Sequence, residues 1–403
     1  MHLPLLHGLT AFIVSYALLV AASSRGAKAF YSILTMVVSF IILATTPGII
    51  ESSVIAFFSW NDIRAIVILY FSLMTAGILK EVGVLDRLLK GASKGGCRFG
   101  GIAVPSLVGL LPMPGGALVS AIIVRDRYLE ELKLDKETSV YLNFWFRHIW
   151  VPVWPLFQAL IISAAVLGVK EGSIIRITWP AGIASLIAGV LVALVLLRSK
   201  TCHLNERGSL LDLLYGLWPF ILIATLVIFL NINMVISIII TLILVVFYYK
   251  PSMEKIMKAV LFASTPTIIG VIVLSLIFKE LLVRTSAPTD LLHLAESSGL
   301  NPYIVSYLVT FIAGIAAGGE AFFAATAIPL LLPLIEPSKG LISAPTLLAA
   351  FTGGYMGVMV SPVHLCLALT VEYFQAKLSK SILLSSIAAF ITTIIVMAYI
   401  FLL

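Results

Sequence analysis

Apolar stretches fill nearly the whole chain, and only short polar segments separate them. A helix of about 20 apolar residues crosses the roughly 30 Å hydrocarbon core of a bilayer. The first stretch follows no basic segment, so we expect a retained span and not a cleaved signal peptide. We predict about ten membrane-spanning helices, over residues 3–23, 29–48, 63–80, 139–168, 177–197, 211–230, 232–249, 259–280, 343–374 and 381–402. The longest polar segments are loop-sized and lie near residues 79–98, 125–138, 198–209 and 284–301.

Two further apolar runs are interrupted near their midpoints. Residues 99–124 contain PMPGG, and residues 301–334 contain AAGGE. Proline removes a backbone donor, and glycine tolerates turns that a helix cannot make. Such opened backbone is stable at membrane depth only where protein or a water-filled cavity covers it. We therefore predict a re-entrant hairpin in each run.

The basic residues support the first of these hairpins. Lys and Arg concentrate in cytoplasmic loops, and most of the 26 basic residues fall on one side if both termini lie outside and residues 99–124 return to their starting side. A full crossing would separate the basic clusters around Arg98 and Arg125. With 61% hydrophobic and 11% charged residues, the net charge of +7 reflects membrane topology and not nucleic-acid binding. We expect a multi-pass protein of the cytoplasmic (inner) membrane.

The predicted elements recur in the same order in residues 1–200 and 201–403: three helices, a hairpin, a long helix interrupted by proline, and a last helix. In the first half the hairpin is residues 99–124, the interrupted helix is 139–168 and the last helix is 177–197. In the second half these elements are residues 301–334, 343–374 and 381–402. Five crossings per half make the second half inverted, so the first hairpin faces the cytoplasm and the second faces outside. We predict an all-α polytopic membrane protein of two inverted repeats, an architecture that places a substrate site near mid-membrane.

Arg147 and Glu320 are the charged residues that the membrane should make most costly. Arg147 lies about two turns into residues 139–168, at roughly 10 Å depth, and a buried guanidinium needs a partner such as a carboxylate or phosphate. Glu320 follows a Gly-Gly break, where it could bind a cation or carry a proton. Structural alternatives stay open: Arg147 could reach the cytoplasmic face or pair with a carboxylate, and Glu320 could cap a half-helix or pair with a basic residue from another segment.

Polar and flexible residues around the breaks complete the candidate site. Backbone amides at a half-helix N-terminus bind anions, although Gly and Pro there could serve only close packing. The histidines fit packing roles equally well. The predicted substrate-binding residues are Pro112, Pro114, Gly115, Gly116, Ser120, Asn143, Arg147, His148, Gly318, Gly319, Thr352, Gly353, Gly354, Ser361 and His364, with Glu320 for ion coupling.

The sequence gives little sign of metal or enzyme chemistry. The three cysteines show no CxxC spacing, and the spacing of His364 and Cys366 with Glu320 is not diagnostic of a metal site. We expect no metal and no cofactor beyond a coupling proton or sodium ion. Walker A, HExxH and GxSxG motifs are absent, so we do not predict an enzyme or an ATP-driven pump.

The runs GLLPMPGGALVSA and GGYMGVMVSPVHLCLALTVEYF resemble a family of uncharacterised bacterial and archaeal integral membrane proteins, assigned to a domain of unknown function. That family is similar to the ion transporter superfamily, which includes gluconate, citrate and dicarboxylate permeases and some sodium/proton antiporters. The resemblance covers most of the chain and implies scaffold and transport portions, often in a homodimer. It implies hairpin tips at Pro112–Gly116 and Gly318–Glu320, and unwinding near Val151–Pro155 and Ser361–His364.

These observations together predict a secondary active transporter. It would move a small carboxylate-type anion with a proton or sodium gradient, by elevator-like or rocking alternating access. The main alternative is a cation/proton antiporter in which Glu320 binds the cation and Arg147 is structural. An intramembrane enzyme or a scaffold fits less well, because the spans hold no catalytic pair and a scaffold does not explain two broken hairpins. The expected partners are the anion and the lipid bilayer.

Overall fold

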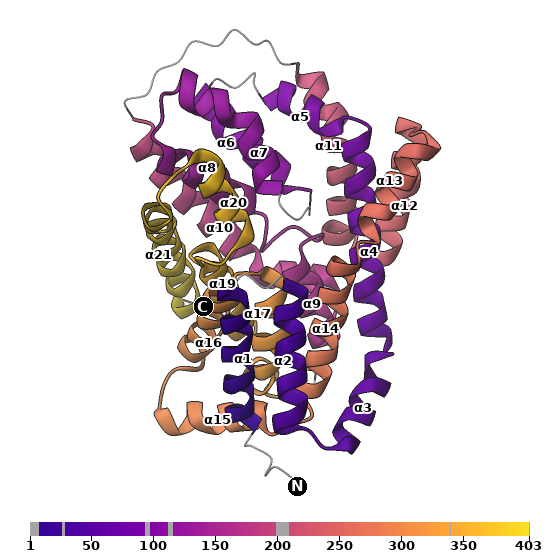
Figure 1. Cartoon of the computed structure of the whole chain (residues 1–403), viewed down its shortest axis with the longest axis vertical. Coiled ribbons are helices and arrows are strands. Elements are labelled where there is room, and N and C mark those ends of the chain that lie inside the picture. Colours follow the sequence, from indigo (N-terminus) through magenta and orange to yellow (C-terminus); the bar gives the residue numbers. More distant parts are fainter. Residues whose placement is uncertain are drawn as a thin grey trace.

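The computed structural model describes residues 8–25, 29–92, 97–111, 116–198, 209–338 and 340–402. Within these ranges the chain is almost entirely helical, and its single β-type pairing is the bridge between Ser338 and Leu341. The helices lie side by side along one long axis, with short helices across both ends (Figure 1). The prediction of an all-helical protein is therefore confirmed.

The helices of the first half are α1 (Gly8–Ser24), α2 (Ala29–Ala44), α3 (Pro47–Phe57), α4 (Trp60–Glu81), α5 (Val84–Ala92), α6 (Cys97–Gly109), α7 (Gly116–Asp126), η2 (Arg127–Glu131), α8 (Lys136–His148), α9 (Gln158–Leu167) and α10 (Glu171–Leu196). Those of the second half are α11 (Leu210–Ala224), η3 (Thr225–Phe229), α12 (Met234–Tyr249), α13 (Met253–Ala263), α14 (Pro266–Leu282), α15 (Ala287–Ser298), α16 (Pro302–Ala317), α17 (Glu320–Leu330), α18 (Leu332–Ile335), α19 (Ala344–Met359), α20 (Leu365–Phe374) and α21 (Leu378–Leu402).

Four of the described helices are long and apolar enough to cross a membrane: α4, α10, α21, and Leu211–Phe229 of α11 with η3. Other apolar helices are shorter, and α12 and α16 have 16 residues each, about 24 Å at the helical rise. Such helices reach across a bilayer only with help from flanking residues or tilted neighbours. The helices thus have the character of a membrane protein, while the count of ten crossings stays a prediction.

Several stretches differ from their predictions, and one of them is α3, which continues to Phe57 although no helix was predicted between residues 48 and 63. Residues 259–280 are not one helix, because α13 ends at Ala263 and α14 begins at Pro266. Proline lacks a backbone donor and is tolerated at the first position of a helix, so it favours a new start at this point. Residues 84–92 and 287–298, expected within loops, form α5 and α15, which lie toward opposite ends of the molecule (Figure 1).

The breaks predicted in residues 301–334, 139–168 and 343–374 are present, whereas the break predicted at residues 112–115 lies outside the described residues. α16 and α17 meet at Gly318, whose φ of +62° suits glycine, and at the extended Gly319. Turns replace helix over residues 149–157 between α8 and α9, and over residues 360–364 between α19 and α20. α6 and α7 lie toward one end of the long axis and α16 and α17 toward the other (Figure 1). The arrangement of the chain as two inverted repeats stays a prediction.

Small residues bring α16 and α19 into close contact. A Cβ atom on Gly353 would lie 2.2 Å from the backbone oxygen of Tyr307, and one on Gly357 would lie 2.2 Å from that of Phe311. Helices in membranes associate through such small residues because lipid provides no hydrophobic driving force. The close contact fixes the end of α19, and hence the break after it, against the second hairpin.

Candidate functional site

The end of α8 carries Arg147 and His148 into the interior. Asp135 caps the start of this helix by accepting hydrogen bonds from the backbone nitrogen of Thr138 at 2.8 Å and from its hydroxyl at 2.7 Å. Basic side chains are favourable in the last turn, where the helix dipole is negative. Arg147 is only 4% exposed. It therefore stays inside the protein, and the alternative in which it reaches the cytoplasmic face is not supported.

The Arg147 guanidinium lies against the start of α7. A Cβ atom on Gly116 would approach its Nη2 to 2.3 Å, so only glycine fits there without displacing the arginine. Asn143, one turn earlier on α8, donates a 2.8 Å hydrogen bond from Nδ2 to the carbonyl oxygen of Ala117. The guanidinium and the first backbone amides of α7 consequently share one small region, in which both favour negative charge.

Two imidazoles and a thiol lie beside this guanidinium. Nη1 of Arg147 is 3.2 Å from Nε2 of His148 and 4.0 Å from Sγ of Cys366. The rings of His148 and His364 meet edge to face, with centroids 5.1 Å apart. His364 is 5% exposed, and neither of its ring nitrogens has a hydrogen-bond partner among the residues that the structure describes.

The second hairpin adds a carboxylate to the same region. Glu320 begins α17 directly after the glycine turn, and Arg147 acts electrostatically on its carboxyl group. The turn packs on the break after α19, because a Cβ atom on Gly318 would lie 2.8 Å from the backbone nitrogen of His364. Ser361 fastens this contact by donating a 2.5 Å hydrogen bond to the carbonyl oxygen of Ile315.

The structure thus gathers one group of the predicted site residues, contributed by α7, α8, the turn before α17 and the break before α20. Its members are Gly116, Asn143, Arg147, His148, Gly318, Glu320, Ser361 and His364.

The other predicted residues make structural contacts or fall outside the described chain. The Ser120 hydroxyl donates to the carbonyl oxygen of Ala117 at 3.1 Å, and that of Thr352 donates to the carbonyl oxygen of Leu348 at 2.7 Å, each within its own helix. Glycines at the remaining described positions pack against neighbouring atoms: Gly319 on Phe322, Gly353 on Tyr307 and Gly354 on Phe323. Pro112, Pro114 and Gly115 lie outside the described residues.

Sequence reasoning missed Tyr355 as a positioning residue. Its hydroxyl donates a 3.0 Å hydrogen bond to the carbonyl oxygen of His148, and the Ser185 hydroxyl lies 2.7 Å away. Tyr355 is fully buried on α19. It therefore connects α19 and α10 to the end of α8, where Arg147 is held. A tyrosine inside the glycine-rich GGYMG run was the available signal, since a buried phenol needs a partner.

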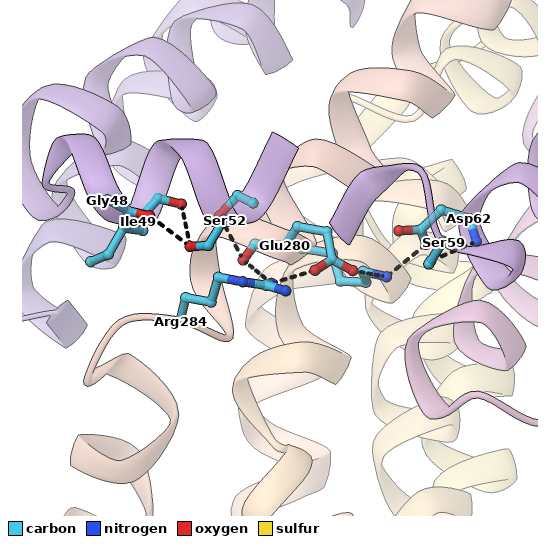
Figure 2. A network of polar contacts seen from close by, with 9 residues as sticks. Gly48, Ile49, Ser52, Ser59, Asp62, Glu280 and Arg284 are labelled. Atoms are coloured by element: carbon cyan, nitrogen blue, oxygen red, sulfur yellow. Dashed lines mark hydrogen bonds and ion pairs between the residues drawn. The ribbon is translucent and has the colours of Figure 1, made fainter. Parts of the chain in front are cut away.

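A network of buried ion pairs was also missed, away from Arg147, between the start of α4 and the end of α14 (Figure 2). Nζ of Lys279 lies 2.6 Å from Oδ1 of Asp62 and 2.5 Å from Oε1 of Glu280. Glu280 also pairs with Arg284, and its carbonyl oxygen accepts a 3.2 Å hydrogen bond from the Ser53 hydroxyl. The network ties two helices from different halves together.

The chain matches a known protein family. A family profile described as Protein of unknown function (DUF401) matches residues 12–403, which is nearly the whole chain. No curated protein matches the sequence.

Proposed function

The chain belongs to the DUF401 family of proteins of unknown function, and we propose that it is a secondary active transporter for a small carboxylate-type anion. The observation that carries this proposal is the placement of Arg147. Its buried guanidinium lies against the start of α7 and interacts electrostatically with the carboxyl group of Glu320. A guanidinium offers paired donors that match a carboxylate, and a helix start adds backbone donors and a positive dipole.

The arrangement suggests how an ion gradient would be coupled to the anion. While Glu320 is negatively charged, it competes with an incoming carboxylate for the field of Arg147. A proton or a sodium ion on Glu320 removes this competition and makes anion binding more favourable. The two charges come from different halves of the chain, so cation and anion bind together where the halves meet.

The finer architecture belongs to the same proposal. The two hairpins act as gates in two inverted repeats of five crossings each, in the inner membrane, with both termini outside. The order α4, α5, α6–α7, α8–α9, α10 matches the order α14, α15, α16–α17, α19–α20, α21 and supports the repeat. Kinship with the ion transporter superfamily and assembly as a homodimer are parts of the proposal that rest on sequence resemblance.

The test uses purified protein reconstituted in liposomes and a panel of small mono-, di- and tricarboxylates. We expect at least one carboxylate to raise the melting temperature and to be taken up when a proton or sodium gradient is imposed. Arg147→Gln should abolish both effects, and Arg147→Lys should retain part of them, because lysine keeps the charge and loses the paired donors. Arg176→Gln, at an exposed arginine of α10, is the matched control.

Glu320→Gln separates coupling from binding. The variant should bind the anion without dependence on pH or sodium, and it should fail to concentrate the anion against its gradient. Glu372→Gln changes an exposed glutamate and should leave transport unaltered. Sodium-driven proton movement that needs no anion and survives Arg147→Gln would replace this proposal with the cation/proton antiporter.

A further inference from the structure

We propose that His148, His364 and Cys366 form a binding site for a soft or borderline transition-metal ion such as Zn(II) or Cu(I). One ligand atom from each of the three side chains lies within 4.8 Å of the other two. Two imidazoles and a thiolate suit these ions, whereas magnesium and calcium prefer oxygen ligands. Zinc bonded to nitrogen and sulfur separates its ligand atoms by roughly 3.5 Å, so a contraction of about 1.3 Å at most would complete the site.

His148 is already oriented as a metal ligand. Its Nδ1 lies 2.7 Å from the carbonyl oxygen of Phe144, and its Nε2 lies 3.2 Å from a guanidinium nitrogen of Arg147. Arginine only donates, so Nε2 accepts and Nδ1 carries the proton that is donated to Phe144. A ligand histidine commonly gives its second N–H to a backbone carbonyl in this way. The electron pair of Nε2 therefore accepts from Arg147, and the thiol of Cys366 also interacts with this ring.

His364 supplies the second, independent observation. The residue is 5% exposed, and neither ring nitrogen has a partner of good hydrogen-bond geometry among the described residues, although the ring interacts with the Gly318 backbone. A buried polar group without a partner costs about 1–3 kcal/mol. A metal ion coordinated by one nitrogen of this ring would remove that cost for the nitrogen. The side chains around the ring do not satisfy its nitrogens, so we infer that a bound metal ion does.

Arg147 sets the behaviour expected of this site. Its guanidinium contacts Nε2 of His148, the nitrogen that would bind the metal ion, and its positive charge repels a cation. Metal binding therefore requires the guanidinium to move away from His148. A metal ion and Arg147 compete, and removing the arginine side chain should tighten metal binding. Where Arg147 also holds the anion of the proposed function, the metal ion would inhibit transport.

The test measures metal binding directly in the purified full-length protein, prepared with an affinity tag that contains no histidine. Co(II) replaces Zn(II) as a spectroscopic probe, and a thiolate-to-cobalt absorption band reports the Cys366 ligand. We expect about one equivalent of Co(II), displaced by Zn(II). Binding should weaken at least about 10-fold in Cys366→Ser and in His364→Gln, and tighten in Arg147→Gln. The absorption band should be lost in Cys366→Ser.

Controls separate this site from the other histidines and cysteines of the chain. Cys97→Ser, Cys202→Ser and His293→Gln should leave the cobalt spectrum and its stoichiometry unchanged. Melting curves in the absence of metal show whether each variant is folded. The proposal is overturned if wild type binds none of Co(II), Zn(II) and Cu(I) tightly, or if the thiolate band survives Cys366→Ser and disappears in Cys202→Ser. Because this readout needs no transport, it stands or fails separately from the response to carboxylates.

Discussion

Lys279→Met tests the buried ion-pair network between α4 and α14. The ammonium of Lys279 forms ion pairs with two carboxylates, those of Asp62 at 2.6 Å and Glu280 at 2.5 Å (Figure 2). Methionine keeps the length and apolar contacts of the lysine side chain and removes its charge. Glu280 would retain Arg284, whereas Asp62 would lose its ion-pair partner. The destabilising effect should therefore arise mainly at Asp62.

The burial of these groups sets the magnitude. The side chains of Asp62 and Lys279 are 0% and 7% exposed. Removing one partner of a pair buried to this degree costs about 3–5 kcal/mol, because an uncompensated charge is left out of water. Asp62→Asn added to Lys279→Met removes that charge as well. The double variant should recover part of the loss, with an interaction free energy of about 0.5–3 kcal/mol.

The assay is a double-mutant cycle on the free energy of unfolding, measured by tryptophan fluorescence in mixed detergent micelles. The matched control is Lys258→Met, which breaks the pair between Lys258 and Glu254 on α13 at a similar distance of 2.7 Å. That pair is exposed, with side chains 55% and 75% accessible, so its loss should change stability little. Equal and small effects of Lys279→Met and Lys258→Met would refute the reasoning, since they would mean that water screens both pairs alike.

Two further substitutions test packing near the candidate site. Gly357→Ala should separate α19 from α16 and lower the melting temperature, because the new Cβ would lie 2.2 Å from a backbone oxygen of α16. Gly48→Ala is the control and should be neutral, because nothing lies within 4 Å of its Cβ position. Equal melting temperatures of the two variants would contradict this reasoning. Gly116→Ala should displace the Arg147 guanidinium and weaken carboxylate-induced stabilisation by more than it lowers the melting temperature itself; unchanged carboxylate binding would show that this contact does not position the arginine.

The hydrophobic pattern predicts the all-helical, membrane-protein character of the fold, because long apolar runs bounded by charges leave few alternatives to membrane helices. The breaks at Gly318–Gly319 and after Met359 were predictable from Gly and Pro within such runs. The short helices α5 and α15 were not, because nine and twelve residues of mixed polarity resemble loops. The boundary at Pro266 was missed because the apolar run continues across it.

The candidate site could be predicted in part from the sequence. Arg147 and Glu320 stand out because a charge within an apolar run is costly. The contact between His148 and His364 could not be foreseen, because it depends on how two helix breaks from different halves pack together. Glycines are ambiguous in sequence, since they permit both unwinding and close packing; Gly353 and Gly354 serve packing in this structure. The pairing of Lys279 with Asp62 could not be foreseen either, because the two residues are 217 positions apart in the sequence.

The arrangement of charges explains why the two halves need each other under the proposed mechanism. Arg147 comes from the interrupted helix of the first half, and Glu320 comes from the hairpin of the second. Separating the halves would leave a guanidinium and a carboxylate uncompensated in a region of low dielectric, which is unfavourable for either alone. A carboxylate on Arg147 together with a cation on Glu320 neutralises both charges at once. The charges of the site are then balanced both when it is empty and when it holds anion and cation together, so both forms can close. A site that holds only one of the two ions keeps an unbalanced charge and cannot close, which is what coupling requires.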